Sequence, residues 1–201
     1  MSPSAAFYED IWVIVDDGVY EPADDTFMLC ANLEISPGET VLEIGTGCGL
    51  VAIVAAKAGA KVVATDQSAA AVQNAKKNVT LHGYGSRVEI RQGDLFEPIS
   101  TEETFTLLLF NPPYLPGTKD DPAFDPAWSG GIKGYEVTER FLDQCVQYLD
   151  PNGRLLLVQS TLADPKRIQL RLERLFRRVK VKEEKAFFFE RLLLFETQDP
   201  K

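Results

Sequence analysis

Short apolar runs alternate with helical patterns along most of this 201-residue chain, and no other feature constrains its fold as strongly. Val, Ile, Leu and Phe dominate five such runs, as is typical of strands buried on both faces: residues 40–44, 61–65, 88–92, 105–110 and 154–159. Helical patterns lie between or after them, at residues 51–58, 69–81, 137–149 and 165–176. This order predicts an α/β fold in which helices cover both faces of a mainly parallel sheet. Residues 179–185 and 191–197 indicate two closing strands without a helix between them, so one of the seven strands should be antiparallel.

The first 35 residues do not follow this alternation and are expected to form an amino-terminal extension. Residues 11–20 alternate in polarity around Asp16-Asp17-Gly18, which predicts a hairpin, and residues 24–33 predict a short helix. We expect residues 1–201 to form a single domain, with its core at residues 36–201. Residues 115–134 are the one long irregular segment, and such segments in compact domains are usually functional or disordered.

The composition excludes several classes of protein. Hydrophobic residues make up 45% of the chain and charged residues 25%, and no apolar run approaches the ~20 residues of a membrane span. We therefore expect a cytoplasmic protein that does not enter a membrane. The three cysteines (Cys30, Cys48 and Cys145) are widely spaced and form no CxxC pair, so they predict reduced thiols and no metal site.

The net charge of −9 is unevenly distributed along the chain. Residues 1–165 carry 10 Lys and Arg against 24 Asp and Glu, whereas residues 166–201 carry 11 against 6. An acidic surface repels phosphates, so we expect contact with nucleic acid only through the basic helix near Lys166 to Arg178.

A glycine-rich loop lies where the first core strand turns into a helix. Its sequence is Glu43-Ile44-Gly45-Thr46-Gly47-Cys48-Gly49, and glycines at such a turn let the backbone approach a ligand closely. The spacing is Gly-x-Gly-x-Gly, whereas a dinucleotide-binding loop would show Gly-x-Gly-x-x-Gly. The acidic Glu43 also suits a cationic sulfonium better than a pyrophosphate. S-adenosylmethionine is therefore favoured over NAD as the cofactor.

Polar residues also follow the next three strands. Asp66 ends the second strand and Asp94 follows the third, while Asn111 follows the fourth. The carboxyl ends of parallel strands are where ligands bind in open α/β sheets. Asp66 can accept hydrogen bonds from ribose hydroxyls, and Asp94 can accept one from an adenine amino group against which Leu95 packs.

The tetrapeptide Asn111-Pro112-Pro113-Tyr114 can hold a planar NH2 group. The Asn111 side-chain oxygen and the Pro112 carbonyl can each accept one N–H bond, the prolines stiffen the backbone, and Tyr114 can stack on the planar group. Orienting a poorly nucleophilic conjugated nitrogen is what its methylation requires. Trp128, Gly130 and Gly131 are expected in a loop that covers the substrate, where glycines would let a peptide approach.

On these motifs the chain resembles the class I methyltransferases, and among them the HemK-like release-factor glutamine methyltransferases. The resemblance extends over about the whole chain and is greatest to the archaeal and eukaryotic branch, which lacks an amino-terminal helical domain. Five segments carry it: residues 19–26, 43–49, 94–96, 111–116 and 128–134. Asp24 stands where the family more often has Glu.

The resemblance implies a Rossmann-like fold and a set of functional residues. The implied cofactor-binding residues are Tyr20, Glu21, Pro22, Thr26, Glu43, Gly45, Gly47, Asp66, Asp94, Leu95 and Asn111. Asn111, Pro112 and Tyr114 are the implied catalytic residues. It further implies that the substrate is the Gly-Gly-Gln loop of a class I translation release factor. Its last implication is a small zinc-binding activator that adds a strand at the sheet edge near Val88 to Gln92.

Other functions remain open at this stage. Lysine side chains of histone-like proteins are substrates within the same branch. The same tetrapeptide also suits adenine N6 in DNA, although the chain offers no separate unit for base flipping and is acidic. A small RNA could bind through the basic helix, and a cofactor-binding adaptor without catalysis is the alternative that is not an enzyme.

Overall fold

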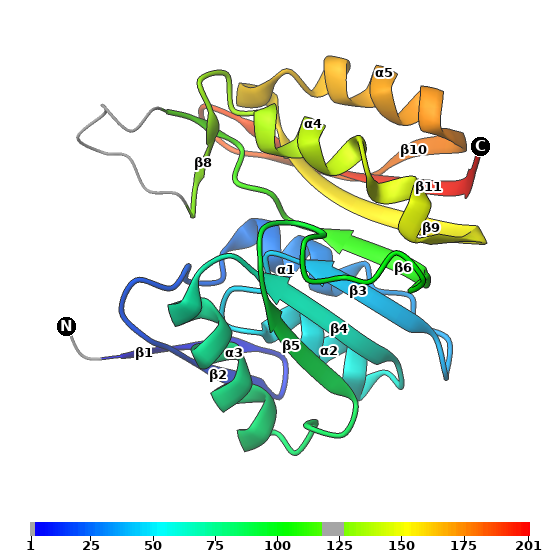
Figure 1. Ribbon diagram of the computed structural model, residues 1–201. Coiled ribbons are helices and arrows are strands. Elements are labelled where there is room, and N and C mark those ends of the chain that lie inside the picture. The colour runs from blue at the N-terminus through cyan, green and yellow to red at the C-terminus, as the bar shows by residue number, and fades with distance from the viewer. Residues whose placement is uncertain (1–2, 118–126) are drawn as a thin grey trace.

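The computed structural model describes residues 3–117 and 127–201, and its centre is one seven-stranded sheet. The strand order is β10-β11-β9-β6-β3-β4-β5 (Figure 1). The strands comprise β3 (Thr40–Ile44), β4 (Lys61–Asp66), β5 (Val88–Gln92), β6 (Phe105–Phe110), β9 (Leu149–Ser160), β10 (Phe176–Ala186) and β11 (Arg191–Pro200). β11 is antiparallel to both of its neighbours, and the pairings among β3, β4, β5, β6 and β9 are parallel. The predicted fold class, including the reversed strand, is confirmed.

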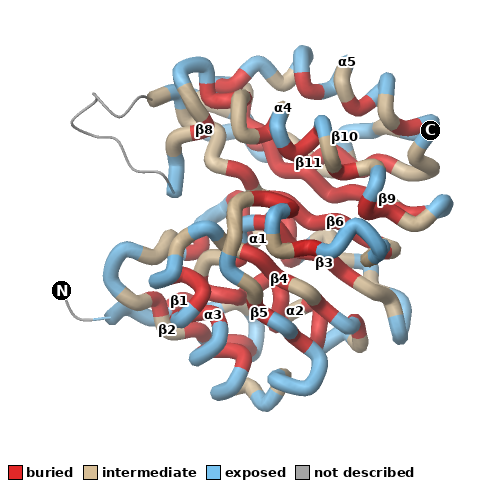
Figure 2. The backbone as a smooth tube through the Cα atoms, viewed as in Figure 1, coloured by how far each residue is buried: buried red, intermediate tan, exposed pale blue. Residues whose placement is uncertain are grey.

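Helices cover both faces of this sheet. α1 (Asp24–Ala31), α2 (Leu50–Lys57) and α3 (Ala69–Leu81) pack on one face, and α4 (Glu136–Leu142) and α5 (Pro165–Leu175) pack on the other. Alternate side chains of one strand enter different cores, since Leu107 and Leu109 belong to the first and Leu108 and Phe110 to the second. Burial of both faces explains why the strands are apolar throughout, as the buried central segments in Figure 2 show.

The helix predicted at residues 137–149 is wrong in its second half. α4 ends at Leu142, a 3-10 turn η1 (Cys145–Tyr148) follows, and β9 begins at Leu149. The buried positions in this segment are spaced as in a helix, and this spacing accounts for the wrong prediction. The predicted turn at residues 150–153 becomes a bulge, because Phe105 pairs with Leu149 but Leu107 pairs with Arg154.

The amino-terminal hairpin exists, but not around Asp16-Asp17-Gly18. It is formed by β1 (Ser4–Tyr8) and β2 (Ile11–Val15), which pair in an antiparallel register. Gly18 does lie in a turn, in which Val19 N–H donates to Asp16 O at 3.1 Å, but no strand follows it. Instead, residues 18–23 continue to the edge of a cavity.

Two buried asparagines of α3 hold β2 in place. Asn78 Oδ1 accepts from Ile14 N–H at 3.0 Å, and the amides of Asn74 and Asn78 both donate to Ile14 O. Asn78 also donates to Cys48 O at 2.8 Å. These bonds replace the strand partner that β2 lacks on this side, and they connect the extension to the glycine-rich loop.

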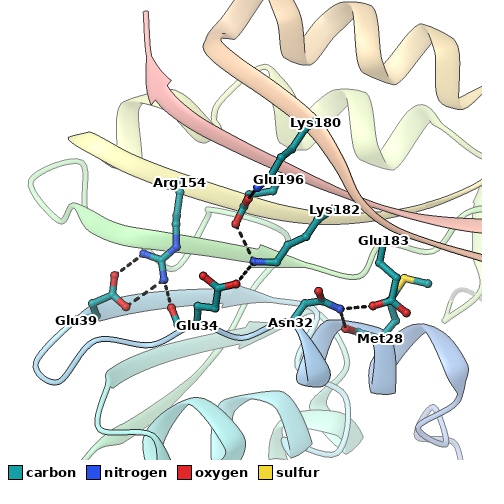
Figure 3. Close-up of polar contacts among 9 residues, drawn as sticks. All are labelled: Met28, Asn32, Glu34, Glu39, Arg154, Lys180, Lys182, Glu183 and Glu196. Carbon is teal, nitrogen blue, oxygen red and sulfur yellow. Dashed lines mark hydrogen bonds and ion pairs between the residues drawn. The ribbon is translucent and has the colours of Figure 1, made fainter.

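A cluster of charged residues joins the segment after α1 to the carboxyl-terminal strands (Figure 3). Arg154 pairs with Glu39 and donates to Glu34 O, and Lys182 lies 2.7 Å from Glu34 and 3.0 Å from Glu196. Burial alone would raise the pKa of Glu39, but the hydrogen bonds from Arg154 and Ser36 outweigh it and lower that pKa.

We expect Arg154→Leu to lower the free energy of unfolding by about 1–3 kcal/mol at neutral pH, because Glu39 loses a charged partner. A lowered carboxyl pKa stabilises the fold above the ordinary pKa of about 4.3, and this contribution is lost progressively as the pH falls below that value and through the lowered pKa of the folded state. The difference between variant and wild type should therefore shrink below about pH 4. Denaturant unfolding measured across pH tests this, with Arg174→Ala on the exposed face of α5 as the control. A difference that does not change with pH would contradict the assignment.

Candidate active site

A cavity of about 790 Å³ opens at the carboxyl ends of the parallel strands. All the predicted site residues except Gly130 and Gly131 line it. From the extension these are Tyr20, Glu21, Pro22 and Thr26; from the sheet and its loops they are Glu43, Gly45, Gly47, Asp66, Asp94, Leu95, Asn111, Pro112 and Tyr114, together with Trp128. Residues far apart in the sequence are thus brought together in one place.

The glycine-rich loop adopts backbone conformations that favour glycine. Gly45, Gly47 and Gly49 all have positive φ, at 71°, 56° and 85°. A Cβ on Gly49 would lie 3.1 Å from Ala75 Cα, so this glycine also allows α3 to pack closely against the loop.

Asp66 fixes the loop rather than projecting freely into the cavity. Its two carboxylate oxygens accept hydrogen bonds from Gly47 N–H and Ser68 N–H, each at 2.9 Å. Burial raises the pKa of Asp66, although these two bonds oppose the effect. A carboxylate has further acceptor capacity beyond two bonds, so Asp66 can still accept from a ligand hydroxyl.

Glu43 is a buried carboxyl at the base of the cavity. Thr46 Oγ1 donates to it at 2.8 Å, and it forms no ion pair within residues 3–117 and 127–201. Burial raises the pKa of Glu43 to about 8, and the nearby Asp66 charge adds to the rise. A cation in the cavity would favour the ionised carboxylate and lower this pKa, so Glu43 suits a positively charged ligand.

Asp94 and Leu95 lie in the turn after β5. Leu95 is buried with a φ of 51°, and its carbonyl accepts from Thr65 Oγ1 at 3.3 Å. Asp94 is paired with Arg140 of α4, a contact that the sequence did not indicate. Any ligand amino group that reaches Asp94 would therefore share its carboxylate with Arg140.

Asn111 ends β6 and provides an acceptor without a partner. Its side-chain Oδ1 is buried, and no group in the described part of the chain donates to it. Buried polar atoms are nearly always hydrogen-bonded, so each exception requires an explanation, and a catalytic role is one. Pro112 is buried beside it, and both residues line the cavity.

Tyr114 is held by Asp25, a residue that the sequence analysis did not select. The Tyr114 hydroxyl donates to Asp25 Oδ2 at 2.9 Å, and the Tyr20 hydroxyl donates to the same atom at 2.8 Å. Thr26 N–H donates to Asp25 Oδ1 at 2.6 Å. Burial, reinforced by the Asp25 charge, raises the pKa of both tyrosines, so they remain neutral hydrogen-bond donors. Asp25 thereby fixes the orientation of the Tyr114 ring.

Gly130 and Gly131 contact the chain itself instead of lining the cavity. A Cβ on Gly130 would lie 2.3 Å from both Pro113 O and Gly134 O, and one on Gly134 would lie 2.4 Å from Tyr114 O. Strand β8 (Ser129–Gly131) pairs with β7 (Leu115–Pro116) directly after the tetrapeptide. Gly130 and Gly134 therefore let the loop pack against the backbone of the tetrapeptide, whereas Gly131 makes room for the Glu136 side chain. Within the loop, residues 118–126 lie outside the described residues.

Trp128 lies at the rim of the cavity. It is half exposed, and its ring meets that of Tyr20 edge to face at 6.4 Å between centroids. This position is compatible with a substrate contact and equally with a role as a hydrophobic anchor of the loop.

Much of the basic helix is neutralised within the chain. Arg167 pairs with Glu139, Arg171 with Asp143, and Arg178, just beyond α5, with Asp199. No helix in the described residues is long and apolar enough to cross a membrane, and these residues contain no His, Cys, Asp and Glu cluster suited to a metal ion.

The fold and the cavity define a class I methyltransferase. The family model described as the methyltransferase small domain matches residues 11–189, so the chain belongs to this family, and within it to the HemK-like methyltransferases. A Methanocaldococcus jannaschii protein named as a protein N5-glutamine methyltransferase is 37% identical, over 88% of this chain and 89% of its own length. Human methyltransferase HEMK2 is 34% identical over 75% of each chain.

Other relatives are longer, and solved structures agree with the fold. The chain covers only 58% of the Rhodopirellula baltica release factor glutamine methyltransferase, to which it is 34% identical. The Mtq2–Trm112 complex of E. cuniculi, responsible for methylation of the eRF1 translation termination factor, matches with 27% identity and a TM-score of 0.72, over 90% of this chain and 99% of that one. The T. thermophilus 16S rRNA methyltransferase RsmC, in complex with AdoMet and guanosine, matches 98% of this chain and 50% of its own with a TM-score of 0.74; at 17% identity it supports the fold alone.

Proposed function

We propose that this methyltransferase uses S-adenosylmethionine to methylate the glutamine side-chain nitrogen in the Gly-Gly-Gln loop of a class I translation release factor. The unpartnered buried Oδ1 of Asn111 carries this proposal, since it is an acceptor placed at the cavity with no partner of its own. The names of the M. jannaschii and R. baltica relatives support glutamine as the acceptor.

The cavity residues suit the proposed cofactor. Glu43 would face its positive charge, Asp66 its ribose, and Asp94 with Leu95 its adenine, while Tyr20, Glu21, Pro22 and Thr26 close the other wall. S-adenosylmethionine, when bound, supplies a methyl group that an attacking nitrogen takes as the S–C bond breaks. The buried Glu43 carboxyl, which has a hydrogen bond from Thr46 but no ion-pair partner among the described residues, fits this cofactor because a cationic ligand would stabilise its ionised form.

The protein's own contribution is orientation. In this proposal Asn111 Oδ1 and the Pro112 carbonyl accept the two N–H bonds of the glutamine amide, which fixes its plane. Tyr114, locked by its bond to Asp25, covers the amide face and excludes water. Holding the reacting atoms in line is worth several kcal/mol of barrier. The nitrogen loses one of its protons after the methyl transfer, so no strong general base is required.

We further propose a small zinc-binding activator as partner. Strand β5 is an edge of the sheet, as expected from the sequence, and an open edge can accept an added strand. The small partner protein in the Mtq2–Trm112 complex supports such a subunit. Co-purification, with and without deletion of the host's corresponding small protein, tests this assignment.

Transfer of labelled methyl groups tests the main proposal. We expect label in a purified class I release factor, and none in the same factor with the Gly-Gly-Gln glutamine replaced by alanine. A histone-like protein, RNA and DNA serve as competing acceptors, each assayed with and without a co-purified partner. Label in DNA or in lysine residues, with none in the release factor, would refute the proposal.

A further inference from the structure

Three consecutive phenylalanines form the turn between β10 and β11. Phe188 and Phe189 are 92% and 84% exposed, more than any other large hydrophobic residue in the described chain, whereas Phe187 is 37% exposed. The rings of Phe188 and Phe189 pack edge to face with centroids 4.6 Å apart. Exposing two such rings costs solubility without adding to the core, which indicates an interaction surface. We call residues 187–189 the aromatic tip.

The aromatic tip is held firmly. Phe187 N–H donates to Glu190 O at 2.7 Å, which closes the turn, and Ala186 pairs with Arg191 at its base. Ser160 Oγ donates to the Glu190 carboxylate, and Arg191 N–H donates to Thr161 Oγ1 at 2.9 Å. Because these bonds order the turn in advance, docking on the tip would lose little conformational entropy.

The aromatic tip lies beside the mouth of the active-site cavity. Lys185 at its base pairs with Asp24, the neighbour of the Asp25 that holds Tyr114. The turn lies on the same side of the molecule as β8 (Figure 1), and η2 (Thr161–Ala163), to which it is bonded, packs against β7. Burial raises the pKa of Tyr114, and the Glu190 charge adds to the effect, which is consistent with this proximity.

Further exposed apolar residues come from segments near this mouth. Trp128 and Ile132 flank β8, and Leu162 lies in η2; they are 50%, 73% and 46% exposed. The cavity rim and the tip therefore present apolar groups to whatever macromolecule brings the acceptor.

Charge distinguishes a protein from a nucleic acid as the occupant. The two cations beside the tip are already paired, Lys185 with Asp24 and Arg191 with Glu184, and Glu190 adds a further carboxylate. These residues therefore offer a phosphate backbone no surplus of positive charge. The edge-to-face ring pair also lacks the parallel faces on which successive bases stack.

We propose that the aromatic tip is a substrate-docking element, which binds apolar side chains of the substrate protein outside the acceptor glutamine loop. This inference rests on the proposed function, and it assigns part of the specificity to a surface beyond the cavity. Such a surface would let the enzyme select a folded factor over a free Gly-Gly-Gln sequence.

The test is the double variant Phe188→Ala/Phe189→Ala, assayed on two acceptors. One acceptor is the intact release factor, and the other is a short peptide with only Gly-Gly-Gln and one residue on either side. We expect KM for the intact factor to rise about tenfold or more, because exposed aromatic residues are frequent binding hot spots. The kcat, the KM for the peptide and the thermal unfolding midpoint should stay near wild type. Phe7→Ala, 68% exposed on β1, is the matched control.

Direct binding of the intact factor, measured by titration calorimetry without turnover, gives a second readout. Unchanged affinity and KM in the double variant would overturn the docking role. A loss of activity confined to RNA acceptors would also overturn it. The same holds if the wild type is a dimer that the double variant abolishes while the KM for the substrate protein stays unchanged. If the wild type labels another protein instead of the release factor, the proposed function fails, and the same pair of measurements on that protein decides the role of the tip.

Discussion

Replacing Asn111 with alanine is expected to lower kcat/KM for methyl transfer by about a thousandfold, equivalent to about 4 kcal/mol of transition-state stabilisation. In the proposed mechanism this side chain is one of two acceptors that fix the plane of the glutamine amide. Without it the amide rotates, and the nitrogen no longer presents the face that reacts. Because Asn111 Oδ1 has no partner within the described chain, its removal leaves no other group unsatisfied. The variant should therefore fold normally.

Three measurements separate catalysis from folding and cofactor binding. Single-turnover methyl transfer gives the chemical step, calorimetric titration with S-adenosylmethionine gives cofactor affinity, and thermal unfolding gives stability. Only the single-turnover rate of methyl transfer should change by more than about tenfold. Asn152→Ala, at an exposed position on the bulge of β9, is the control for replacing an asparagine. An Asn111→Ala enzyme with activity within tenfold of wild type would exclude the tetrapeptide as the origin of catalysis.

The core and the cavity could be predicted because both depend on local patterns repeated along the chain. Each central strand is apolar on both faces, and several cavity residues lie at or just after the carboxyl end of such a strand, as Asp66 ends β4 and Asn111 follows β6. In a parallel sheet the carboxyl ends lie along one edge, so sequence position alone brings these residues together.

Contacts between distant segments could not be predicted in this way. Asp25 meets Tyr114 across 89 positions, and in the sequence it is only one of two acidic residues at the start of a helix. The hairpin was misplaced for a similar reason. Its position depends on the asparagine side chains of α3, which bond to the backbone of Ile14 some 60 positions away. Gly130 has no such local pattern either, and its role depends on the carbonyl of Pro113.

Replacing Gly130 with alanine is expected to lower kcat/KM by about a hundredfold and the free energy of unfolding by about 1–3 kcal/mol. The added Cβ would lie 2.3 Å from the carbonyl oxygens of both Pro113 and Gly134, and neither backbone atom can rotate away as a side chain would. The tetrapeptide must therefore shift, and a shift of about 1 Å at the acceptor position is enough to cost two orders of magnitude.

The matched control for this substitution is Gly85→Ala, because a Cβ at Gly85 meets no atom within 4 Å and its φ is not positive. We expect the control to keep full activity and equal or greater stability, since alanine restricts the unfolded chain more than glycine does. The affinity of the Gly130 variant for S-adenosylmethionine should change less than its kcat, because the glycine-rich loop and Asp66 lie on other segments. If Gly130→Ala retained wild-type kcat, the loop would not support the tetrapeptide, and its glycines would then be better explained by close approach of the substrate.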